Sequence, residues 1–218
     1  SPILSKSNNY VYDMLDFDKA SEIPGMEHFY TIQGEGKNTG RAAYFIRLAG
    51  CDVECSWCDV KDSWSASKTQ LLSIDFLIKE VSQYNNDLVV ITGGEPSIYD
   101  LTALTKALKN AGKEIAIETS GSSELRGQFD WICLSPKKFK LPLAAAYKKA
   151  DELKVVIFNK HDFKWCKEQA SNVLANCELY LQPEWDKQDE HTNELVEFIK
   201  DNTTWKLSLQ THKFLDIP

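Results

Sequence analysis

The stretch Cys51-Asp52-Val53-Glu54-Cys55-Ser56-Trp57-Cys58 places three cysteines within eight residues, in the spacing C-x3-C-x2-C. A loop of this kind can wrap three thiolates around one face of a cubic iron–sulfur cluster and leave the fourth iron without a protein ligand. Thiolates are soft ligands that suit such clusters. The open iron can then bind a chelating molecule, so the spacing indicates chemistry rather than architecture.

Two other roles fit these cysteines less well. A structural zinc site takes four ligands, but the nearest histidines are His28 upstream and His161 downstream. A disulfide framework is typical of short secreted chains, whereas this chain has 218 residues and we expect no signal peptide. Cys133, Cys166 and Cys177 lie in apolar stretches and are predicted to be buried thiols.

The composition favours a protein with a sizeable core that does not bind nucleic acid. Hydrophobic residues make up 43% of the chain, charged residues 26%, and the net charge is −7. Non-specific binding to nucleic acid needs a basic face, which an acidic balance disfavours. There is no run of 18 apolar residues, so we expect no membrane span. Six cysteines without a signal peptide indicate a reducing, cytoplasmic location.

Short apolar runs alternate with helical patterns along most of the chain. Some runs, such as residues 88–92, are almost continuously hydrophobic, as in a parallel sheet buried on both faces. The alternation implies βαβ units, and about half a dozen units are too few for a closed eight-fold barrel. We therefore predict an α/β fold, an open partial (β/α)6-type barrel with a mainly parallel sheet. It forms a single domain over residues 26–218, after a partly ordered N-terminal leader over residues 1–25. The predicted strands are 27–32, 43–48, 88–92, 114–118, 131–134, 153–158, 178–182 and 205–209.

Four amphipathic patterns between the strands predict helices. In the first, Ile74, Leu77, Ile78 and Val81 have helical spacing, and Ser73 before them is a predicted N-cap. The others are Leu101/Leu104/Thr105/Leu108 with Gly112 as a stop, Phe163/Cys166/Ala170/Val173, and Leu195/Val196/Phe198/Ile199.

Turns with chemical character follow five of the predicted strands. Each turn alone is weak evidence, because each is also an ordinary connection. Ligands bind at the carboxyl ends of strands in open α/β sheets, so together the turns predict one mouth. They are the cysteine loop, Gly93-Gly94-Glu95-Pro96, Thr119-Ser120-Gly121, Ser135-Pro136-Lys137 and Gln182-Pro183.

The cysteine spacing followed by Gly-Gly-Glu-Pro resembles the radical S-adenosylmethionine (SAM) superfamily, whose short members have the open barrel predicted above. The resemblance narrows to the 7-carboxy-7-deazaguanine synthase family and covers residues 27–218. It is carried by Phe29-Tyr30-Thr31-Ile32-Gln33-Gly34-Glu35-Gly36, Arg47, Glu118-Thr119-Ser120-Gly121, Ser135-Pro136-Lys137, Glu152-Leu153-Lys154-Val155-Val156, Gln182-Pro183 and Gln210-Thr211-His212-Lys213-Phe214-Leu215-Asp216-Ile217-Pro218.

The resemblance implies a specific chemistry. SAM would chelate the open iron of a 4Fe-4S cluster, and the reduced cluster would cleave it to a radical. That radical would take a hydrogen from 6-carboxy-5,6,7,8-tetrahydropterin, whose ring would contract, lose ammonia and give 7-carboxy-7-deazaguanine for 7-deazapurines such as queuosine. The resemblance thus implies a lyase of queuosine biosynthesis, a flavodoxin or ferredoxin reductant, and a homodimer.

The family's site residues can be placed on this sequence by its motifs. The cluster ligands correspond to Cys51, Cys55 and Cys58. Arg47 suits the substrate carboxylate, because a guanidinium binds a carboxylate through two parallel hydrogen bonds. The implied SAM contacts are Trp57, Cys58, Asp59, Gly94, Glu95, Ser135, Pro136, Lys137, Gln182, Pro183, Glu184 and Trp185. The implied substrate contacts are Ile32, Gln33, Gly34, Glu35, Arg47, Thr92, His212 and the terminal carboxylate of Pro218.

The chain departs from the family pattern at Val60. Members commonly carry Thr or Ser at this position, two residues after the third cysteine, where the hydroxyl helps to hold Mg2+. Val60 has no side-chain oxygen, and Mg2+ takes oxygen ligands, so we expect weak Mg2+ dependence, with Asp62 as an alternative ligand. Ser120 replaces a commoner Asn, and we expect little consequence from this change.

Two other functions remain open on the sequence alone. A glycyl-radical-enzyme activase shares the cysteine spacing and the SAM chemistry, but it acts on a partner protein and needs an open groove. A non-catalytic iron–sulfur or zinc module would need a fourth ligand and no SAM pocket.

Overall fold

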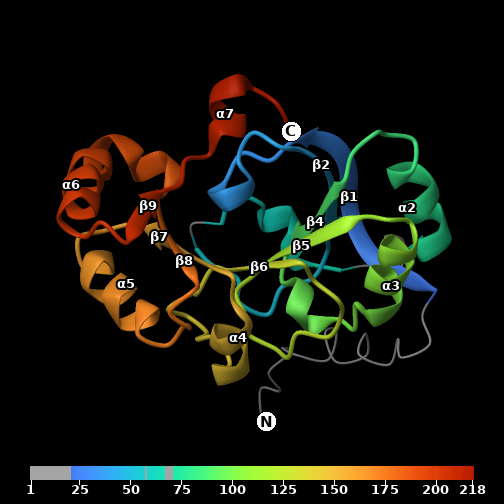
Figure 1. The fold of residues 1–218 in the computed structure, drawn as a ribbon, viewed down its shortest axis with the longest axis horizontal. Helices are drawn as coiled ribbons and strands as arrows, with labels where there is room; N and C mark the ends of the chain where they lie inside the picture. The colour runs from blue at the N-terminus through green and yellow to red at the C-terminus, as the bar shows by residue number, and fades with distance from the viewer. Residues whose placement is uncertain (1–20, 57, 67–70) are drawn as a thin grey trace, which may run out of the picture.

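A computed structural model describes residues 21–56, 58–66 and 71–218, which Figure 1 draws as a ribbon. One sheet of nine strands runs through this described part, in the order β3-β1-β2-β4-β5-β6-β7-β8-β9. The outermost strands, β3 and β9, are not paired with each other, so the sheet is an open partial barrel. The strands are β1 (Glu22–Ile32), β2 (Ala42–Leu48), β3 (Leu71–Ser73), β4 (Leu88–Gly93), β5 (Glu114–Thr119), β6 (Trp131–Leu134), β7 (Glu152–Ile157), β8 (Glu178–Pro183) and β9 (Trp205–Leu207).

The direction of the strands follows the hydrophobic pattern. β1 pairs antiparallel with β2 and with β3, and all pairings from β2 to β9 are parallel. The run Leu88 to Ile91 in β4 is fully buried, as expected for a strand covered on both faces. The predicted open barrel with a mainly parallel sheet is confirmed.

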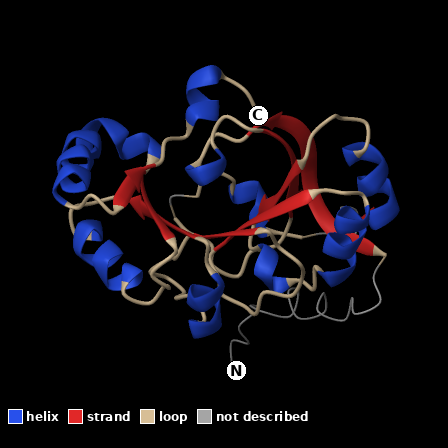
Figure 2. Cartoon of the chain, in the orientation of Figure 1, coloured by secondary structure: helices blue, strands red, loops and turns tan. Residues whose placement is uncertain are grey.

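Helices cover the convex outer side of the curved sheet, as Figure 2 shows. Helix α7 instead lies near the C-terminus, beside the ends of β1 and β2 in Figure 1. The helices are α2 (Ile74–Val81), α3 (Thr102–Asn110), α4 (Ala144–Lys149), α5 (Asp162–Ala170), α6 (Gln188–Asp201) and α7 (Thr211–Leu215), with 3₁₀ turns η1 (Gly36–Asn38), η2 (Lys61–Trp64), η4 (Pro96–Ile98) and η5 (Trp185–Lys187).

Helix α2 shows how local sequence sets an element. The Ser73 hydroxyl oxygen accepts a hydrogen bond from the Phe76 backbone N–H at 3.1 Å, which caps the helix as predicted. Leu77 and Val81 are buried on its inner face. All four predicted helices are present, although Val173 lies beyond the end of α5.

Several predicted boundaries were wrong. Strand β7 begins at Glu152 and ends at Ile157, one residue earlier than predicted, and β9 ends at Leu207 rather than at residue 209. Helices α4 and α7 and strand β3 were not predicted, because segments of three to six residues are too short to show a period. β1 begins at Glu22 and pairs with β3 from there, so the last residues of the expected leader lie in the sheet. Residues 1–20 lie outside the described part, and the division into leader and domain stays a prediction.

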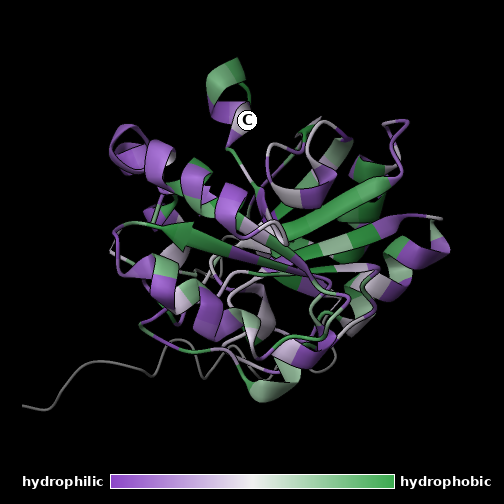
Figure 3. Cartoon of the chain, turned by 60° about the vertical axis from the view of Figure 1, so that its left-hand side comes forward, coloured by the Kyte–Doolittle hydropathy of each residue, from purple (hydrophilic) through white to green (hydrophobic). Residues whose placement is uncertain are grey.

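The hydrophobic core lies between the sheet and the outer helices in two main clusters. One packs β2, β4 and β5 against α2 and α3, and the other packs β7 and β8 against α4, α5 and α6. Figure 3 shows the matching hydropathy, with green strands and largely purple outer helices. No described helix is long and apolar enough to cross a membrane.

Candidate functional site

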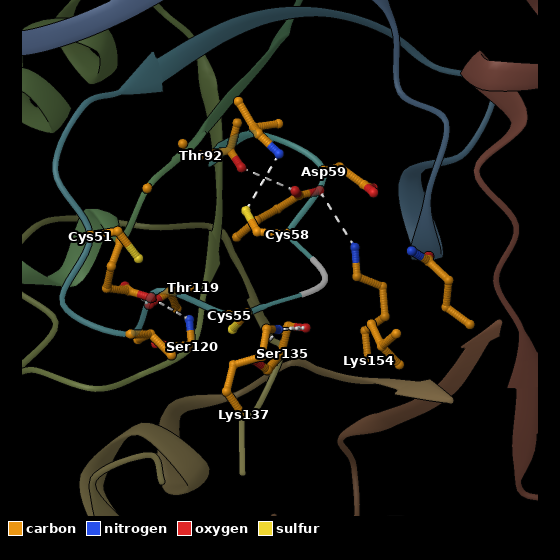
Figure 4. A pocket seen from close by; sticks show the side chains of 18 of the residues that line it. Cys51, Cys55, Cys58, Asp59, Thr92, Thr119, Ser120, Ser135, Lys137 and Lys154 are labelled. Atoms are coloured by element: carbon orange, nitrogen blue, oxygen red, sulfur yellow. Dashed lines mark hydrogen bonds and ion pairs between the residues drawn. The ribbon is translucent and has the colours of Figure 1, made fainter. Parts of the chain in front are cut away.

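The turns that follow the parallel strands line one cavity, seen from close by in Figure 4. Cys51, Cys55 and Cys58 line it together with Gly94 and Glu95. We call it the cysteine cavity. It is also lined by residues that follow β6, Ser135 and Lys137. The end of β8 and the start of η5 contribute Gln182, Pro183, Glu184 and Trp185. The predicted convergence of strand ends on one mouth is therefore observed.

A second cavity, the tail cavity, adjoins the first. The two share six lining residues, among them Glu35, Thr92 and Glu118, so they lie side by side. Every residue that the resemblance implied for the substrate lines the tail cavity: Ile32, Gln33, Gly34, Glu35, Arg47, Thr92, His212 and Pro218. Of the implied SAM contacts, Trp57 lies outside the described residues, and Pro136 lines neither cavity.

The cysteine loop presents free thiols to the cysteine cavity. Cys51 and Cys55 are buried, Cys58 is half-buried, and all three are free. Burial raises the pKa of the Cys51 thiol, and it raises that of Cys55 to about 11 although the Lys137 ammonium opposes the shift. Metal binding to these thiols must therefore displace protons. No three His, Cys, Asp or Glu side chains in the described part gather closely enough to hold a single metal ion.

Glycines bring the turn after β4 against the cysteine loop. Gly93 has a φ of 128°, a conformation that favours glycine. A β-carbon on Gly94 would collide with the Gly50 carbonyl oxygen. The Gly94 and Glu95 backbone N–H groups donate to the carbonyl oxygens of Leu48 and Gly50 at 2.9 and 2.8 Å. The start of the cysteine loop is thus bonded to the turn that faces it.

Glu95 braces this turn. Its carboxylate is 2% exposed and accepts hydrogen bonds from the backbone N–H groups of Ser97 and Ser120, at 2.9 and 2.7 Å, and from the Thr119 hydroxyl. Because the carboxylate is engaged by the protein, the structure gives Glu95 a positioning role. Its predicted contact with SAM is untested.

Four buried polar atoms at the two cavities have no hydrogen-bond partner. Trp64 Nε1, Ser120 Oγ and Glu184 Oε2 belong to residues of the cysteine cavity, and Arg47 Nε to the tail cavity. Burial raises the pKa of the Glu184 carboxyl. An unpaired buried polar atom is costly, so these atoms suit bound ligands that carry donors and acceptors.

Arg47 is both paired and directed into the tail cavity. Its Nε lies 2.6 Å from Glu27 Oε1, without the alignment of a hydrogen bond, and its guanidinium lies over the Phe29 ring at 5.8 Å. Glu27 is its cross-strand neighbour on β1. The ion pair with Glu27 does not remove Arg47 from the tail cavity, and its contact with the substrate carboxylate stays a prediction.

A charged network lies where the cavities meet. Lys154 is 4% exposed, and its ammonium forms an ion pair with Glu35 and lies 3.9 Å from Glu118 Oε1. The Gln33 side-chain amide donates to Glu118 Oε1 at 2.9 Å, and the Gln210 amide donates to Glu35 Oε1 at 3.0 Å. The network places two carboxylates and one cation at the boundary between the two cavities.

The charges of this network depend on one another. Burial alone would raise the pKa of the Glu35 carboxyl, but the Lys154 ammonium and hydrogen bonds from Lys154 and Gln210 lower it to about 2. Burial alone would lower the pKa of Lys154, but the carboxylates of Glu118 and Glu35 hold it well above its usual value. Lys154, Glu118 and Gln210 were not among the predicted site residues. The sequence did contain one sign of this network, because Lys154 stands within the apolar strand 152–157 and a buried charge needs a partner.

The C-terminal segment lies over the mouth. The Thr211 backbone N–H and hydroxyl each donate to the Gly34 carbonyl oxygen at 3.0 Å. Lys213 forms an ion pair with Asp59 at 2.7 Å, which ties α7 to the cysteine loop. The Thr31 hydroxyl donates to the Pro218 main-chain oxygen at 3.2 Å. His212, Lys213 and Pro218 therefore form one side of the tail cavity.

Val60 lines both cavities with an apolar side chain. The expectation that Asp62 could replace the family's hydroxyl was wrong. Asp62 is exposed in η2 and lines neither cavity. The nearby carboxylate that does line both cavities belongs to Asp59, which is already bonded to Gln210 at 3.0 Å and to Lys213.

Comparisons with known proteins agree with this geometry. The family model described as "Radical SAM superfamily" matches residues 45–157. The 7-carboxy-7-deazaguanine synthase of Flavobacterium psychrophilum is 52% identical, over 92% of this chain and 95% of the relative. The enzyme of the same name from Synechocystis sp. is 46% identical, over 89% and 93%. The crystal structure of QueE from Escherichia coli has a TM-score of 0.81 and 32% identity, covering 94% of this chain and 99% of that one.

Replacing Lys154 by Met should make the free energy of unfolding depend less on pH in the acidic range. The ionised Glu35 stabilises the folded protein fully above the unfolded-state pKa of 4.5, and this contribution is lost as the pH falls toward about 2. Without Lys154 the folded-state pKa rises, so Lys154→Met loses less unfolding free energy across this interval. Urea unfolding at several acidic pH values measures the slope, with Lys164→Met, 87% exposed on α5, as the control. Equal slopes in wild type and Lys154→Met would contradict the assignment.

Proposed function

We propose how the two cavities work from one premise: this chain belongs to the 7-carboxy-7-deazaguanine synthase family of radical SAM enzymes. It is a lyase that converts 6-carboxytetrahydropterin to 7-carboxy-7-deazaguanine with loss of ammonia, in the biosynthesis of 7-deazapurines such as queuosine. Membership brings a 4Fe-4S cluster and SAM as cofactors. An activase or a non-catalytic module is not favoured, because the relatives match over most of their length.

The cysteine cavity fits both cofactors. Three free thiols from one loop face it, and Ser120 and Glu184 present buried polar atoms without partners. We assign Cys51, Cys55 and Cys58 to the cluster. When bound, the cluster and SAM supply one-electron cleavage of a carbon–sulfur bond, which starts the reaction. SAM is assigned to Trp57, Cys58, Asp59, Gly94, Glu95, Ser135, Pro136, Lys137, Gln182, Pro183, Glu184 and Trp185.

The tail cavity suits the pterin acid. Arg47 offers a cation to its carboxylate, and the main-chain oxygen of Pro218 lies in the same cavity. Glu35, held ionised beside Lys154, accepts hydrogen bonds from amino and ring N–H groups of the pterin edge. The segment from Thr211 onward limits access of water, which strengthens these charge interactions. The lining shared by the two cavities carries this proposal, because a ligand in one adjoins a ligand in the other.

We propose that Mg2+ contributes little to this enzyme. Val60 offers no oxygen, and the Asp59 carboxylate is engaged by Gln210 and Lys213. We further propose that the enzyme works in the reducing cytoplasm with a flavodoxin or ferredoxin as electron donor, which the six free cysteines support. A homodimer is proposed by analogy with the family.

Anaerobic reconstitution tests the proposed site. Wild-type protein supplied with iron, sulfide, SAM, dithionite and carboxytetrahydropterin should turn brown and form 7-carboxy-7-deazaguanine. Cys51→Ala should lose both the cluster absorbance and the product, because a three-thiolate site loses one ligand. Cys177→Ala, a buried thiol at the start of β8, is the control. A colourless wild-type protein that retains zinc would contradict the proposal.

Arg47→Met should raise the KM for carboxytetrahydropterin about 10- to 100-fold, because a charge-assisted hydrogen bond contributes about 1.5–3 kcal/mol. The kcat should change less, since this contact holds the ground state as well as the transition state. Steady-state product formation gives both constants. Arg126→Met, whose arginine pairs with Asp100 and lines neither cavity, should behave as wild type. An unchanged KM in Arg47→Met would remove Arg47 from the site.

Chelation of Mg2+ should change wild-type turnover by less than about twofold, because the site lacks the hydroxyl ligand. Val60→Thr restores that hydroxyl and should gain a response to added Mg2+. Product formation in chelator, with and without excess Mg2+, measures both. Strict loss of wild-type turnover in chelator, restored by Mg2+ alone, would show that the ion is held by other groups.

A further inference from the structure

A basic segment interrupts this acidic protein. Between Ser135 and Ala150 there are five lysines and no Asp or Glu, whereas the whole chain has a net charge of −7. The segment runs from the end of β6 through α4, which lies at the bottom of the view in Figure 1. Such a local reversal of charge favours an acidic partner.

Large apolar side chains are exposed within this segment. Phe139 is 59% exposed, Leu141 58% and Leu143 43%. The segment is held in place, since Ala146 and Tyr147 are buried beneath it and the Leu143 backbone N–H donates to the Gly121 carbonyl oxygen at 2.8 Å. We call this area the lysine surface: Lys138, Phe139, Lys140, Leu141, Leu143, Lys148 and Lys149.

The lysine surface borders the cysteine loop. Lys140 forms an ion pair with Asp52, which directly follows Cys51 in the loop. Lys137, one residue before the surface, lines the cysteine cavity, and Figure 4 shows it close to Cys55. The surface therefore flanks the place where the thiols face the cavity.

Charge is distributed unequally over the surface. Lys138 and Lys140 are paired with Asp162 and Asp52. The ammonium groups of Lys148 and Lys149 bond main-chain oxygens, those of Asn172 at 3.2 Å and Leu125 at 3.4 Å, rather than carboxylates. The exposed positions of the cysteine loop itself include Glu54 and Asp59, which would repel an acidic protein. An acidic partner that approaches the cysteines is therefore favoured on the lysine surface.

We propose that the lysine surface docks the one-electron carrier of this enzyme, a flavodoxin. The inference rests on the proposed function, because only a cluster at the cysteines needs an electron. In the docked complex the reduced flavin gives up one electron and the cluster gains it, with no other group changed. Flavodoxins are acidic around the flavin, and an apolar centre with a charged rim suits a transient interface. A second copy of this chain is a poorer occupant, since a two-fold contact would set lysines against lysines.

Binding of oxidised flavodoxin to the cluster-loaded protein tests the proposal without turnover. Phe139→Asp and the double variant Lys148→Glu/Lys149→Glu should each weaken the Kd about tenfold, measured by calorimetry at low salt. The charge variant should also lose most of the salt dependence of binding. The controls are Val196→Asp on α6 and Lys79→Glu/Lys106→Glu on α2 and α3, all at exposed positions, and they should bind as wild type.

Turnover separates this proposal from the proposed function. With dithionite as reductant, both surface variants should form product at the wild-type rate, and with reduced flavodoxin their KM for the carrier should rise about tenfold. Far-UV circular dichroism checks that the variants are folded. The proposal is overturned by unchanged flavodoxin affinity, by equal weakening in the controls, or by a wild type that works with dithionite but binds no flavodoxin. It is also overturned if the variants lose only a self-association seen by sedimentation. Absence of product with dithionite in wild type would instead refute the proposed function.

Discussion

The contact on which the site depends is the close approach of two backbone turns, at Gly50 and at Gly93-Gly94. Gly50 and Gly93 adopt positive φ angles of 94° and 128°, and side chains on any of the three would collide with neighbouring atoms. The approach lets the N–H of Glu95 bond Gly50, while the N–H groups of Gly50 and Cys51 bond the carbonyl oxygens of Ser63 and Trp64 at 2.7 and 3.2 Å. The start of the cysteine loop is thus held by main-chain bonds to the segment that follows the loop, and the Val60 backbone N–H donates to Cys58 Sγ at 3.4 Å.

Electrostatics connects this loop to the rest of the mouth. Asp52 is held by Lys140 on one side, and Asp59 by Lys213 on the other. Further in, Lys154 separates Glu35 from Glu118 at the boundary of the two cavities. Each ion pair joins residues that are far apart in the sequence, so the mouth is cross-linked by charge although the protein as a whole is acidic. The pair between Lys154 and Glu35 is buried, so the loss of either partner would leave an uncompensated buried charge, which is costly.

The sequence predicted the features that local patterns determine. Continuous apolar runs gave the parallel strands, and Ser73 gave the start of α2, because a hydroxyl before an amphipathic stripe has a local physical meaning. The meeting of five turns followed from the rule for parallel sheets. Local sequence patterns did not predict the tertiary contacts. Helix α7 is five residues long and is held by Gly34 and Asp59, which are far away in the chain. Asp62 and Asp59 look alike in sequence and both are exposed, but Asp59 lines the two cavities, whereas Asp62 lies in a 3₁₀ turn and lines neither.

Most of the buried polar atoms that lack a hydrogen-bond partner lie at the two cavities, and this distinguishes the site from the rest of the protein. In the described residues, six buried side-chain atoms lack a hydrogen-bond partner, and four of them belong to residues that line the two cavities. Each such atom costs about 1–3 kcal/mol when it stays unpaired, so a chain selected only for stability would replace or pair them. Arg47 is an example of an atom that the protein itself does not satisfy. Glu27 lies beside its Nε but does not form an aligned hydrogen bond with it. A bound carboxylate can supply the aligned hydrogen bond that Glu27 does not, so satisfying Arg47 Nε would contribute to the binding of an acidic ligand.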